Sequence, residues 1–437
     1  MRVCIHRGSR EIGGSCVELE SGGRRILLDL GMPLNADEDP RDYLPDVPGL
    51  TYPDDSLLGV LVSHPHIDHC GLLSCLDTAV PVGMGAAARR ILAAAAPFMP
   101  GPWPVPAAGW DFTAGRSFRI GPFEVTPLLV DHSAYDSYAL LIQADGTRVL
   151  YSGDLRAHGR KSRLFDMLVR NPPQDIDVLL MEGTTLGRDT QSAAYRGSCS
   201  SEIEAEQRLQ AIMSESPGMV LVQTSSQNID RVVSVYKAAR CSGRVLLIDL
   251  YTAAILEATG NPRLPQSDWD GIRLFVPQRQ RVQIVRQGLF DLLKRHSRNR
   301  IFPEQLGEVA EQAVLLFRQQ HIQDLNKADC LNGAHYIYAQ WHGYWEREGF
   351  DDVRAWLPRQ QIPRHSVHCS GHAAPEDLRT LAEAIQPRVL VPMHSERPEM
   401  WHSLYDRVDQ HADGSWWDAK PHSPSPQTPS TDPAGLP

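Results

Sequence analysis

The side chains best suited to chemistry lie in the run SHPHIDH at positions 63 to 69, directly after an apolar segment. It places three imidazoles and one carboxylate within six residues, and these nitrogen and oxygen donors are of the kind that zinc binds. Alternate residues of an extended loop point to one side, so His64 and His66 are expected to share one metal ion. Asp68 and His69 then face another. The alternative is a polar loop satisfied by its own hydrogen bonds.

Further ligands must come from elsewhere in the chain, because each zinc ion takes about four donors. Three candidates follow apolar segments: His132 in VDHSAYDSY, Asp154 in YSGDLR and His394 in VLVPMHSE. Open α/β sheets place their sites at the carboxyl ends of strands. One such residue alone is usually a structural hydrogen-bonding group. Three of them together with the histidine run favour a metal centre.

The elements that must position these residues alternate between strand and helix. Segments 15 to 20 and 24 to 30, joined by the turn residues 21 to 23, predict a β-hairpin that begins the protein. The Ala-rich segment 82 to 98 predicts a helix. Apolar, β-branched segments predict further strands at 57 to 64, 122 to 132, 148 to 154 and 177 to 183. The class is therefore α/β.

A second α/β pattern begins near residue 200. It predicts helices at 201 to 213, 228 to 240 and 251 to 258, with strands at 218 to 224 and 244 to 250. We interpret it as a separate unit inserted into the first.

The segment 271 to 300 is basic, with eight Lys and Arg residues and the single acid Asp291. Within it Val282, Val285, Leu289 and Leu292 fall at helical spacing. The pattern predicts an amphipathic helix whose arginines lie on the solvated side. A phosphate-contacting surface is the alternative.

The whole chain is large and acidic. Its 437 residues are 42% hydrophobic and carry a formal charge of -10, so a polyanion must bind at a local site rather than through diffuse attraction. No apolar run could cross a membrane, and the first residues lack the apolar core of a secretory leader. Eight scattered cysteines without a C-x-x-C pair predict buried thiols. A cytoplasmic protein without membrane association is expected.

Taken together, these residues resemble the metal site of the metallo-β-lactamase fold, an αββα sandwich. The resemblance implies that HPHIDH is the metal loop, that His132 is the third histidine and that His394 is the last ligand. It also implies that Asp154 bridges two Zn²⁺ ions, with Mn²⁺ as the alternative metal. Asp29 in ILLDLG matches a position where the family keeps an aspartate, which implies that it fixes the metal loop rather than merely capping a turn.

The long gap between Asp154 and His394 accommodates the second unit. Near its two ends stand Glu182 in LLMEGTTLGR and His372 in HCSGHAAPEDL. With His394 they resemble the three additional motifs of the β-CASP nucleases, whose inserted α/β domain closes over the active site. The implied division is a metallo-β-lactamase part at 1 to 185, a β-CASP domain at 186 to 360, a return to the first domain at 361 to 410, and a disordered tail rich in Pro, Ser and Thr at 411 to 437.

The resemblance also implies a substrate class. The RNA-directed members of this family, such as ribonuclease J and the mRNA 3′-end cleavage endonuclease, carry histidine at the last motif, and His394 matches it. The run from 368 to 396 is similar to the RNA-specificity segment of these enzymes. Single-stranded RNA is therefore the expected partner, and a homodimer is left open.

Substrate contacts are implied by partial matches. TSSQNIDRVV is similar to the phosphate pocket of ribonuclease J, and its candidates are Ser226, Asn228 and Arg231. It departs from that pattern at Gln227 and Asp230. His368 and Ser370 are candidates to touch a substrate phosphate. The segment GAHYIYAQWHGYW lacks the usual Ser-Gly turn of the family.

The implied reaction is hydrolysis of RNA phosphodiester bonds, exo- or endonucleolytic, by a two-metal mechanism in which a metal-bound hydroxide attacks. Asp68 completes the second coordination sphere. His372 is expected to donate a proton to the departing 3′ oxygen while Glu182 holds its ring; a loop histidine bonded to backbone is the alternative for His372. Three rival functions are a DNA nuclease, a small-molecule ester or thioester hydrolase on the same dinuclear site, and a non-catalytic RNA-processing scaffold.

Overall fold

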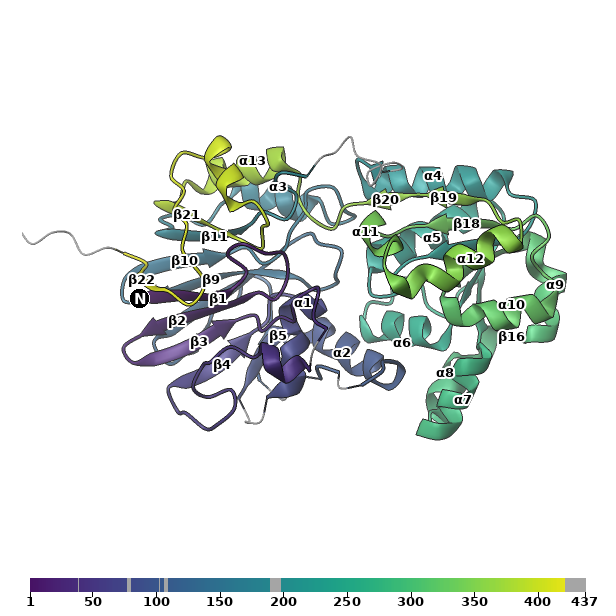
Figure 1. Cartoon of the computed structure of the whole chain (residues 1–437), viewed down its shortest axis with the longest axis horizontal. Helices are drawn as coiled ribbons and strands as arrows, with labels where there is room; N and C mark the ends of the chain where they lie inside the picture. Colours follow the sequence, from purple (N-terminus) through teal and green to yellow (C-terminus); the bar gives the residue numbers. More distant parts are fainter. Residues whose placement is uncertain (38, 77–79, 102, 106–108, 189–197, 421–437) are drawn as a thin grey trace, which may run out of the picture.

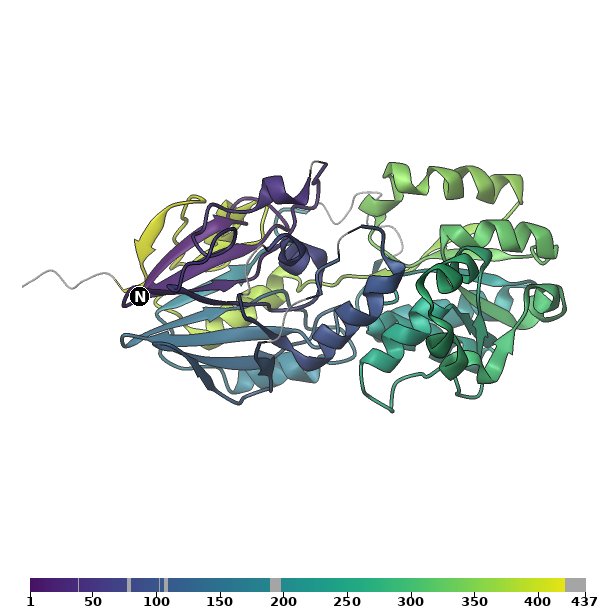
Figure 2. The same ribbon diagram turned by 90° about the horizontal axis from the view of Figure 1, so that it is seen from below.

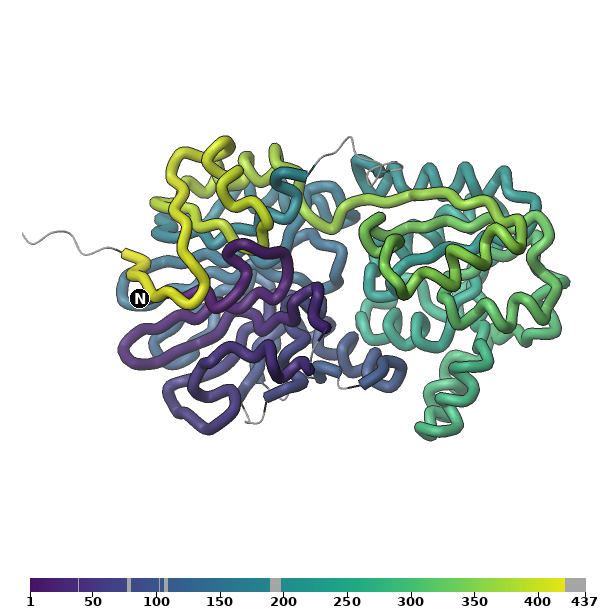
Figure 3. The backbone as a smooth tube through the Cα atoms, in the orientation of Figure 1, coloured from purple at the N-terminus to yellow at the C-terminus, as the bar shows by residue number. Residues whose placement is uncertain are grey.

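Two α/β units lie beside one another in the computed structural model, which describes residues 1–437 apart from 38, 77–79, 102, 106–108, 189–197 and 421–437 (Figure 1). The first unit contains both ends of the described chain. The second is inserted between them, so the chain passes from the first unit to the second and back, as the tube in Figure 3 shows.

The first unit is built from two sheets. One has the order β22 (Trp416–Asp418), β1 (Arg2–Arg7), β2 (Cys16–Ser21), β3 (Arg24–Leu28), β4 (Leu57–Leu61), β5 (Val82–Gly85), β6 (Asp111–Phe112). The other has the order β21 (Val389–Met393), β11 (Val178–Glu182), β10 (Thr147–Tyr151), β9 (Tyr138–Ala144), β8 (Phe123–Leu129), β7 (Phe118–Ile120). The predicted strands are present, and the hairpin of β2 and β3 has its predicted turn.

Alternating side chains explain how the two sheets pack. In β10, Val149 and Tyr151 belong to the core between the sheets, whereas Leu150 belongs to a separate core on the outer side. This period of two lets each strand bury both of its faces.

Helices cover the outer faces. Ala88 and Leu92 of α2 (Ala86–Ala95) share a core with Val60 of β4 on the first sheet, and α1 (Ile67–Cys70) lies beside them. On the other sheet, Leu378 and Leu381 of α13 (Pro375–Ile385) pack in one core with α3 (Arg163–Arg170). The arrangement is the predicted αββα sandwich.

The second unit is a parallel sheet with helices on both faces. Its strand order is β16 (Arg300–Ile301), β15 (Ile272–Phe275), β14 (Val245–Ile248), β17 (Ala313–Phe317), β13 (Val220–Gln223), β18 (His335–Tyr338), β19 (Arg364–Ser366). Its helices are α4 (Glu202–Glu215), α5 (Ile229–Cys241), α6 (Leu250–Ala258), α7 (Gln278–Gln287), α8 (Phe290–His296), α9 (Leu306–Val309), α10 (Ile322–Ala328), α11 (His342–Trp345) and α12 (Asp351–Arg359). A small ladder of β12 (Ser198–Cys199) and β20 (His368–Cys369) joins its two ends.

Polar and helical contacts join the units. α2 packs against α6, and Figure 2 shows α2 reaching the second unit. The guanidinium of Arg156, which is fully buried, donates to Asp230 of the second unit at 2.6 Å and lies 3.4 Å from Asp131 of the first. Burying one cation between two carboxylates fixes the relative placement of the units, because removing either side would leave an unpaired buried charge.

Two predictions about the chain ends are wrong. The hairpin of β2 and β3 does not begin the protein, because β1 precedes it and pairs with β2. The predicted tail includes β22, which pairs with β1, and Ala419 lies in the core between the sheets, so 411 to 420 is ordered. The rest of the predicted tail, 421 to 437, lies outside the described residues.

Two further predictions about the second unit are wrong. β19 belongs to its sheet, so that unit continues past the predicted boundary at 360. The basic segment is not one amphipathic helix, because Gly288 ends α7 in a left-handed conformation with φ 67. Val285 is 66% exposed and Ile284 is buried instead, so the apolar face predicted by spacing points partly to solvent.

In the part of the chain that the structure describes, no helix combines the length and the apolar character that crossing a membrane requires.

Candidate metal centre

The histidine run follows β4, a parallel strand between β3 and β5. After Ser63 the chain turns into the short helix α1, which carries Asp68 and His69. Ser63 donates to the carboxylate of Asp29 from its backbone nitrogen at 2.6 Å and from its hydroxyl at 2.8 Å. The loop is therefore tied to the end of the neighbouring strand β3.

One group of three imidazoles lies on one side of the centre. The Nδ1 atom of His66 is 3.2 Å from Nε2 of His64 and 3.2 Å from Nε2 of His132. His132 comes from the segment after β8, and both His64 and His132 are buried. The Oδ2 atom of Asp154, which follows β10, lies 3.7 Å from Nε2 of His64 and 3.9 Å from Nε2 of His132.

A second group lies on the other side of the same aspartate. Nε2 of His69 is 3.2 Å from Oδ2 of Asp154, and Nδ1 of His394 is 3.7 Å from its Oδ1. Nε2 of His394 is 3.4 Å from Oδ2 of Asp68. The structure thus brings all seven predicted ligands together in two groups. The histidine run is divided between the groups as its spacing predicts, and Asp154 lies between them.

Three of the imidazoles and the shared carboxylate are held in the forms that bind cations, whereas burial would lower the pKa of His69 but the carboxylates of Asp154 and Asp29 raise it. Burial and the neighbouring imidazoles hold the pKa of His64 and of His132 well below the ordinary value. Burial lowers the pKa of His66 to about 4. Burial would raise the pKa of Asp154, but the charges of His394 and His69 hold it well below its usual range. Neutral imidazoles and an ionised carboxylate are the forms that bind metal ions.

Buried polar atoms that have no hydrogen-bond partner indicate whether these residues fit such ions. Within the described part of the chain, both carboxylate oxygens of Asp154 and Nε2 of His69 are buried without a hydrogen-bond partner. Leaving such atoms unpaired is costly, and native proteins rarely do so. Two cations between these nitrogen and oxygen donors would satisfy them, so the residues fit a pair of zinc ions.

Three supporting residues were not found by the sequence reasoning. Tyr151 donates its hydroxyl to Asp29 at 2.6 Å, and Thr184 lies 2.8 Å from Nδ1 of His394 through its hydroxyl. Asp29 also holds Nδ1 of His69 at 2.7 Å. Such contacts fix the ring orientation of metal-binding histidines. Ser63 is the third of these residues, and its only signal in the sequence is its position directly before the histidine run.

Glu182 and His372 meet at the centre although they are far apart in sequence. Nδ1 of His372 is 2.9 Å from Oε2 of Glu182 and 3.7 Å from Oδ2 of Asp154. The other oxygen of Glu182 accepts from the backbone of Leu155 at 2.7 Å. Burial would lower the pKa of His372, but the charges of Glu182 and Asp154 raise it. The protonated form of this imidazole is therefore favoured beside the metal site.

Ser370 and His368, the two predicted substrate contacts close to His372 in sequence, have different surroundings. The hydroxyl of Ser370 accepts from the backbone nitrogen of His372 at 3.1 Å, so it shapes the turn. His368 lies in β20, and burial together with Arg231 and Arg156 lowers its pKa to about 3. Its Nδ1 has no hydrogen-bond partner among the described residues. Contact of either residue with a phosphate stays a prediction.

The side chains of the predicted phosphate pocket make hydrogen bonds and ion pairs within the second unit. Arg231 is fully buried and binds the carboxylate of Glu202 at 2.8 Å as well as the carbonyl of Ala339. The side chain of Asn228 caps α5, and that of Ser226 is buried against Thr252 at 2.6 Å. These side chains hold the second unit together, and contact of Ser226, Asn228 or Arg231 with substrate stays a prediction.

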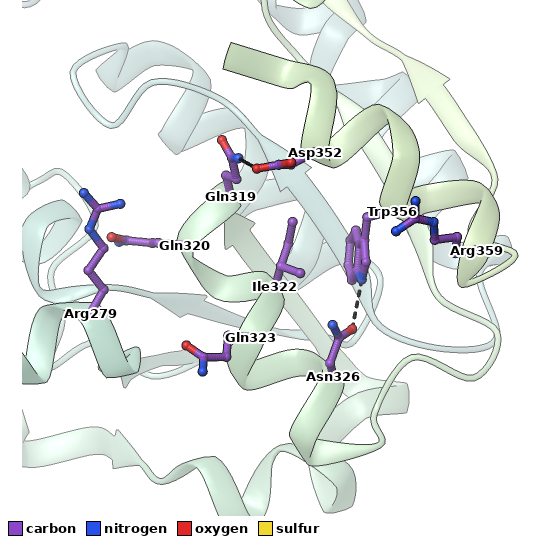
Figure 4. Close-up of a pocket in the computed structure, with 9 residues that line it drawn as sticks. All are labelled: Arg279, Gln319, Gln320, Ile322, Gln323, Asn326, Asp352, Trp356 and Arg359. Carbon is purple, nitrogen blue, oxygen red and sulfur yellow. Dashed lines mark hydrogen bonds between the residues drawn. The ribbon is translucent and has the colours of Figure 1, made fainter. Parts of the chain in front are cut away.

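One hollow lies apart from the centre. Figure 4 shows a pocket of about 650 Å³ in the second unit whose lining includes Arg279, Gln319 and Trp356. It contains none of the predicted ligands. Arg281, which comes from the same basic segment as Arg279, pairs with Asp324 at 3.2 Å. The phosphate-contacting role of that segment stays untested.

Known proteins match this chain in sequence. A family profile described as a beta-lactamase superfamily domain matches residues 24–215. Ribonuclease J of Sinorhizobium meliloti is 26% identical over 387 residues, which are 85% of this chain and 64% of that protein. Ribonuclease J of Mycobacterium tuberculosis is 26% identical over 251 residues, 56% of this chain and 43% of that protein. The chain thus spans less than two thirds of the length of these relatives.

A solved structure matches over nearly the whole chain. It is described as a protein of unknown function from Enterococcus faecalis V583, and it is 21% identical with a TM-score of 0.74. The match covers 95% of this chain and 99% of that one, so both units of the fold recur together.

Proposed function

We propose that this chain is a metal-dependent ribonuclease that hydrolyses single-stranded RNA, because residues 24–215 match the beta-lactamase superfamily domain and the chain is similar to ribonuclease J over both of its units. The observation that carries the proposal is the buried carboxylate of Asp154, which has no hydrogen-bond donor among the described residues and lies between two groups of histidines. A centre of this kind is suited to phosphodiester hydrolysis.

Seven residues would hold the two cations, in the groups His64, His66, His132 and Asp68, His69, His394 with Asp154 between them. When bound, divalent cations of this kind acidify water and offset the charge that develops on phosphate oxygens. Zinc fits the donor set, and manganese is the alternative.

The chain's own residues supply the proton and the alignment. Nδ1 of His372 is engaged by Glu182, so Nε2 is the atom that donates a proton to the departing 3′ oxygen. Asp29 and Thr184 hold the rings of His69 and His394 in place. Cleavage would then leave a 5′-phosphate and a 3′-hydroxyl. Seven of the eight scattered cysteines are buried, Cys241 being exposed, and this pattern supports a reducing compartment such as the cytoplasm.

The test uses the purified full chain with zinc or manganese and end-labelled single-stranded RNA. We expect cleavage by the wild type, loss of both metal and activity in His66→Ala, and retained metal with lost turnover in His372→Ala. His335→Ala, which changes a histidine of β18 in the second unit, serves as the matched control.

Three outcomes would contradict the proposal. Preferential cleavage of single-stranded DNA would indicate a DNA nuclease, and turnover of a lactone or thioester with inert RNA would indicate a small-molecule hydrolase. A metal content below one equivalent together with RNA binding would indicate a scaffold.

A further inference from the structure

The segment after β18 carries aromatic side chains toward the metal centre. Here the sequence reads AQWHGYW, and the short helix α11 forms where the family usually has a Ser-Gly turn. Figure 1 draws α11 at the edge of the second unit that is turned toward the first unit. The helix is therefore on the side of the second unit that faces the first unit, which carries the metal ligands.

Four side chains form a row, which we call the aromatic row: Arg188, Trp341, Tyr344 and Arg347. The guanidinium of Arg188 lies 5.4 Å from the ring centre of Trp341. The rings of Trp341 and Tyr344 meet edge to face at 5.4 Å. The guanidinium of Arg347 lies 5.0 Å from the ring centre of Tyr344. Two aromatic rings in edge-to-face contact thus lie between two guanidinium groups.

The row stands on a rigid base. Trp345, the neighbour of Tyr344, is buried among Tyr336 and Tyr338, with ring centres at 6.0 and 5.1 Å. The hydroxyl of Tyr338 donates to the carbonyl of Trp341 at 2.9 Å. Residues 341 and 344 are three apart at the start of a helix and so share one side. The indole and the phenol of the row are therefore presented in a fixed orientation.

Gly343 makes room for the indole. A Cβ atom at this position would lie 2.2 Å from the ring of Trp341. The indole of Trp341 therefore lies close against the backbone of α11, and the residue is partly exposed. A partly exposed tryptophan held this way offers a ring on which another planar group can stack.

Two members of the row, Arg188 and Tyr344, lie near enough to the residues of the centre to interact with them electrostatically. Burial and the Asp68 carboxylate raise the pKa of Tyr344. Burial, Arg231 and Arg156 lower the pKa of His368, and the charge of Arg188 adds to that effect. Arg188 also follows Glu182 by only six residues.

The charges of the row suit a polyanion. The whole chain carries -10, so an anionic substrate needs a local cationic surface. Among the described residues neither Arg188 nor Arg347 is recorded in an ion pair with a carboxylate. Proteins that bind single strands combine such cations with aromatic rings on which bases stack.

We propose that the aromatic row stacks against the bases of single-stranded RNA next to the scissile phosphate, with its two arginines beside the flanking phosphates. This inference rests on the proposed ribonuclease function and deepens it, because it assigns a base-binding surface that belongs to the second unit.

The experiment measures binding rather than cleavage. Fluorescence anisotropy follows the full chain, in the presence of a chelator, with a labelled oligoadenylate of about 12 nucleotides and with the same strand lacking its bases. We expect the wild type to prefer the strand with bases about tenfold or more. Trp341→Ala and Tyr344→Ala should lose most of that preference and bind the abasic strand as the wild type does.

Controls separate stacking from folding. Trp341→Phe should retain most of the preference, whereas Trp341→Leu, which keeps apolar volume without a ring, should lose it. Tyr52→Ala changes an aromatic residue that is 51% exposed in the first unit and should have no effect. Thermal unfolding of each variant identifies any that are destabilised. If the alanine variants are, the comparison of Trp341→Phe with Trp341→Leu decides whether the aromatic ring is required for the preference.

Three results would overturn the inference. If the alanine variants keep the preference for bases, stacking occurs elsewhere, and the ribonuclease proposal stands. If they lose binding to both strands equally, the row acts through charge or structure alone. If the wild type binds neither strand, both the inference and the choice of RNA as substrate fail.

Discussion

Replacing Asp29 by asparagine tests how the metal loop is held. Asp29 is fully buried, with a φ of 60, and asparagine is one of the few residues that adopts this conformation readily. Its Oδ2 atom contacts His69, Tyr151 and the hydroxyl of Ser63, while Oδ1 accepts from the Ser63 backbone. The shape of the side chain is kept, so the change isolates its charge and hydrogen bonding.

The structure sets the size of the effect. An amide has a single acceptor oxygen, which would stay with the Ser63 backbone, and its NH₂ group would face Nδ1 of His69. That nitrogen must then accept, which moves the ring proton to Nε2, the atom 3.2 Å from Asp154. A protonated Nε2 cannot bind a cation. Losing such a supporting contact typically weakens metal affinity 10- to 100-fold, about 1.4 to 2.7 kcal/mol.

Competition with a chromophoric chelator measures the zinc affinity of each variant. Tyr151→Phe is the matched control, because it removes one hydrogen bond to Asp29 and leaves the carboxylate and the His69 tautomer in place. We expect less than about a tenfold loss in this control. Wild-type zinc affinity in Asp29→Asn, with normal thermal unfolding, would refute the assignment of His69 as a ligand through Nε2.

Three further outcomes are expected. Gly31→Ala would place a Cβ atom 1.8 Å from the carbonyl oxygen of Asp68, so urea unfolding should show a loss of about 1 to 3 kcal/mol with weaker zinc binding; an unchanged midpoint would contradict this crowding. Chelation should lower the melting temperature, since ions at about 1,000 times their Kd add about 4 kcal/mol to folding, and unchanged melting would count against bound metal. Burial would lower the pKa of His6, but hydrogen bonds to Cys4 and Glu18 raise the pKa to about 9. Because this is above the ordinary 6.5, the stabilisation is complete below about pH 6.5 and is lost as the pH rises through 9. It amounts to at most about 3 kcal/mol, and His6→Gln should flatten the unfolding profile over that range, whereas an unchanged slope would rule out this pair.

The metal centre could be predicted because its residue types are rare together and follow strand ends. Asp154 and His394 follow strands that run in the same direction in one sheet, and His64 follows a strand of the sheet packed against it, so the three converge although the chain separates them widely. The supporting residues could not be predicted in this way. Tyr151 and Thr184 act through single hydrogen bonds that only tertiary placement creates.

Arg231 shows that a sequence motif alone does not identify what an arginine binds. An arginine after a helix cap is equally able to bind a phosphate or a carboxylate, and the sequence does not reveal that Glu202 lies beside it. The strand at 416 to 418 was missed for a related reason. Its pairing with β1 joins residues from the two ends of the chain, and no local pattern of three residues predicts such a contact.

The point of insertion explains how binding and chemistry are coupled. Glu182 ends β11 just before the chain leaves the first unit, and His372 follows β20 just after it returns. Their contact at 2.9 Å therefore joins the two crossing points beside the metal ligands. Arg156, held by carboxylates of both units and by the carbonyl of Ser370, fixes the same junction. These contacts would hold a strand stacked on the aromatic row in a fixed register with the proton donor.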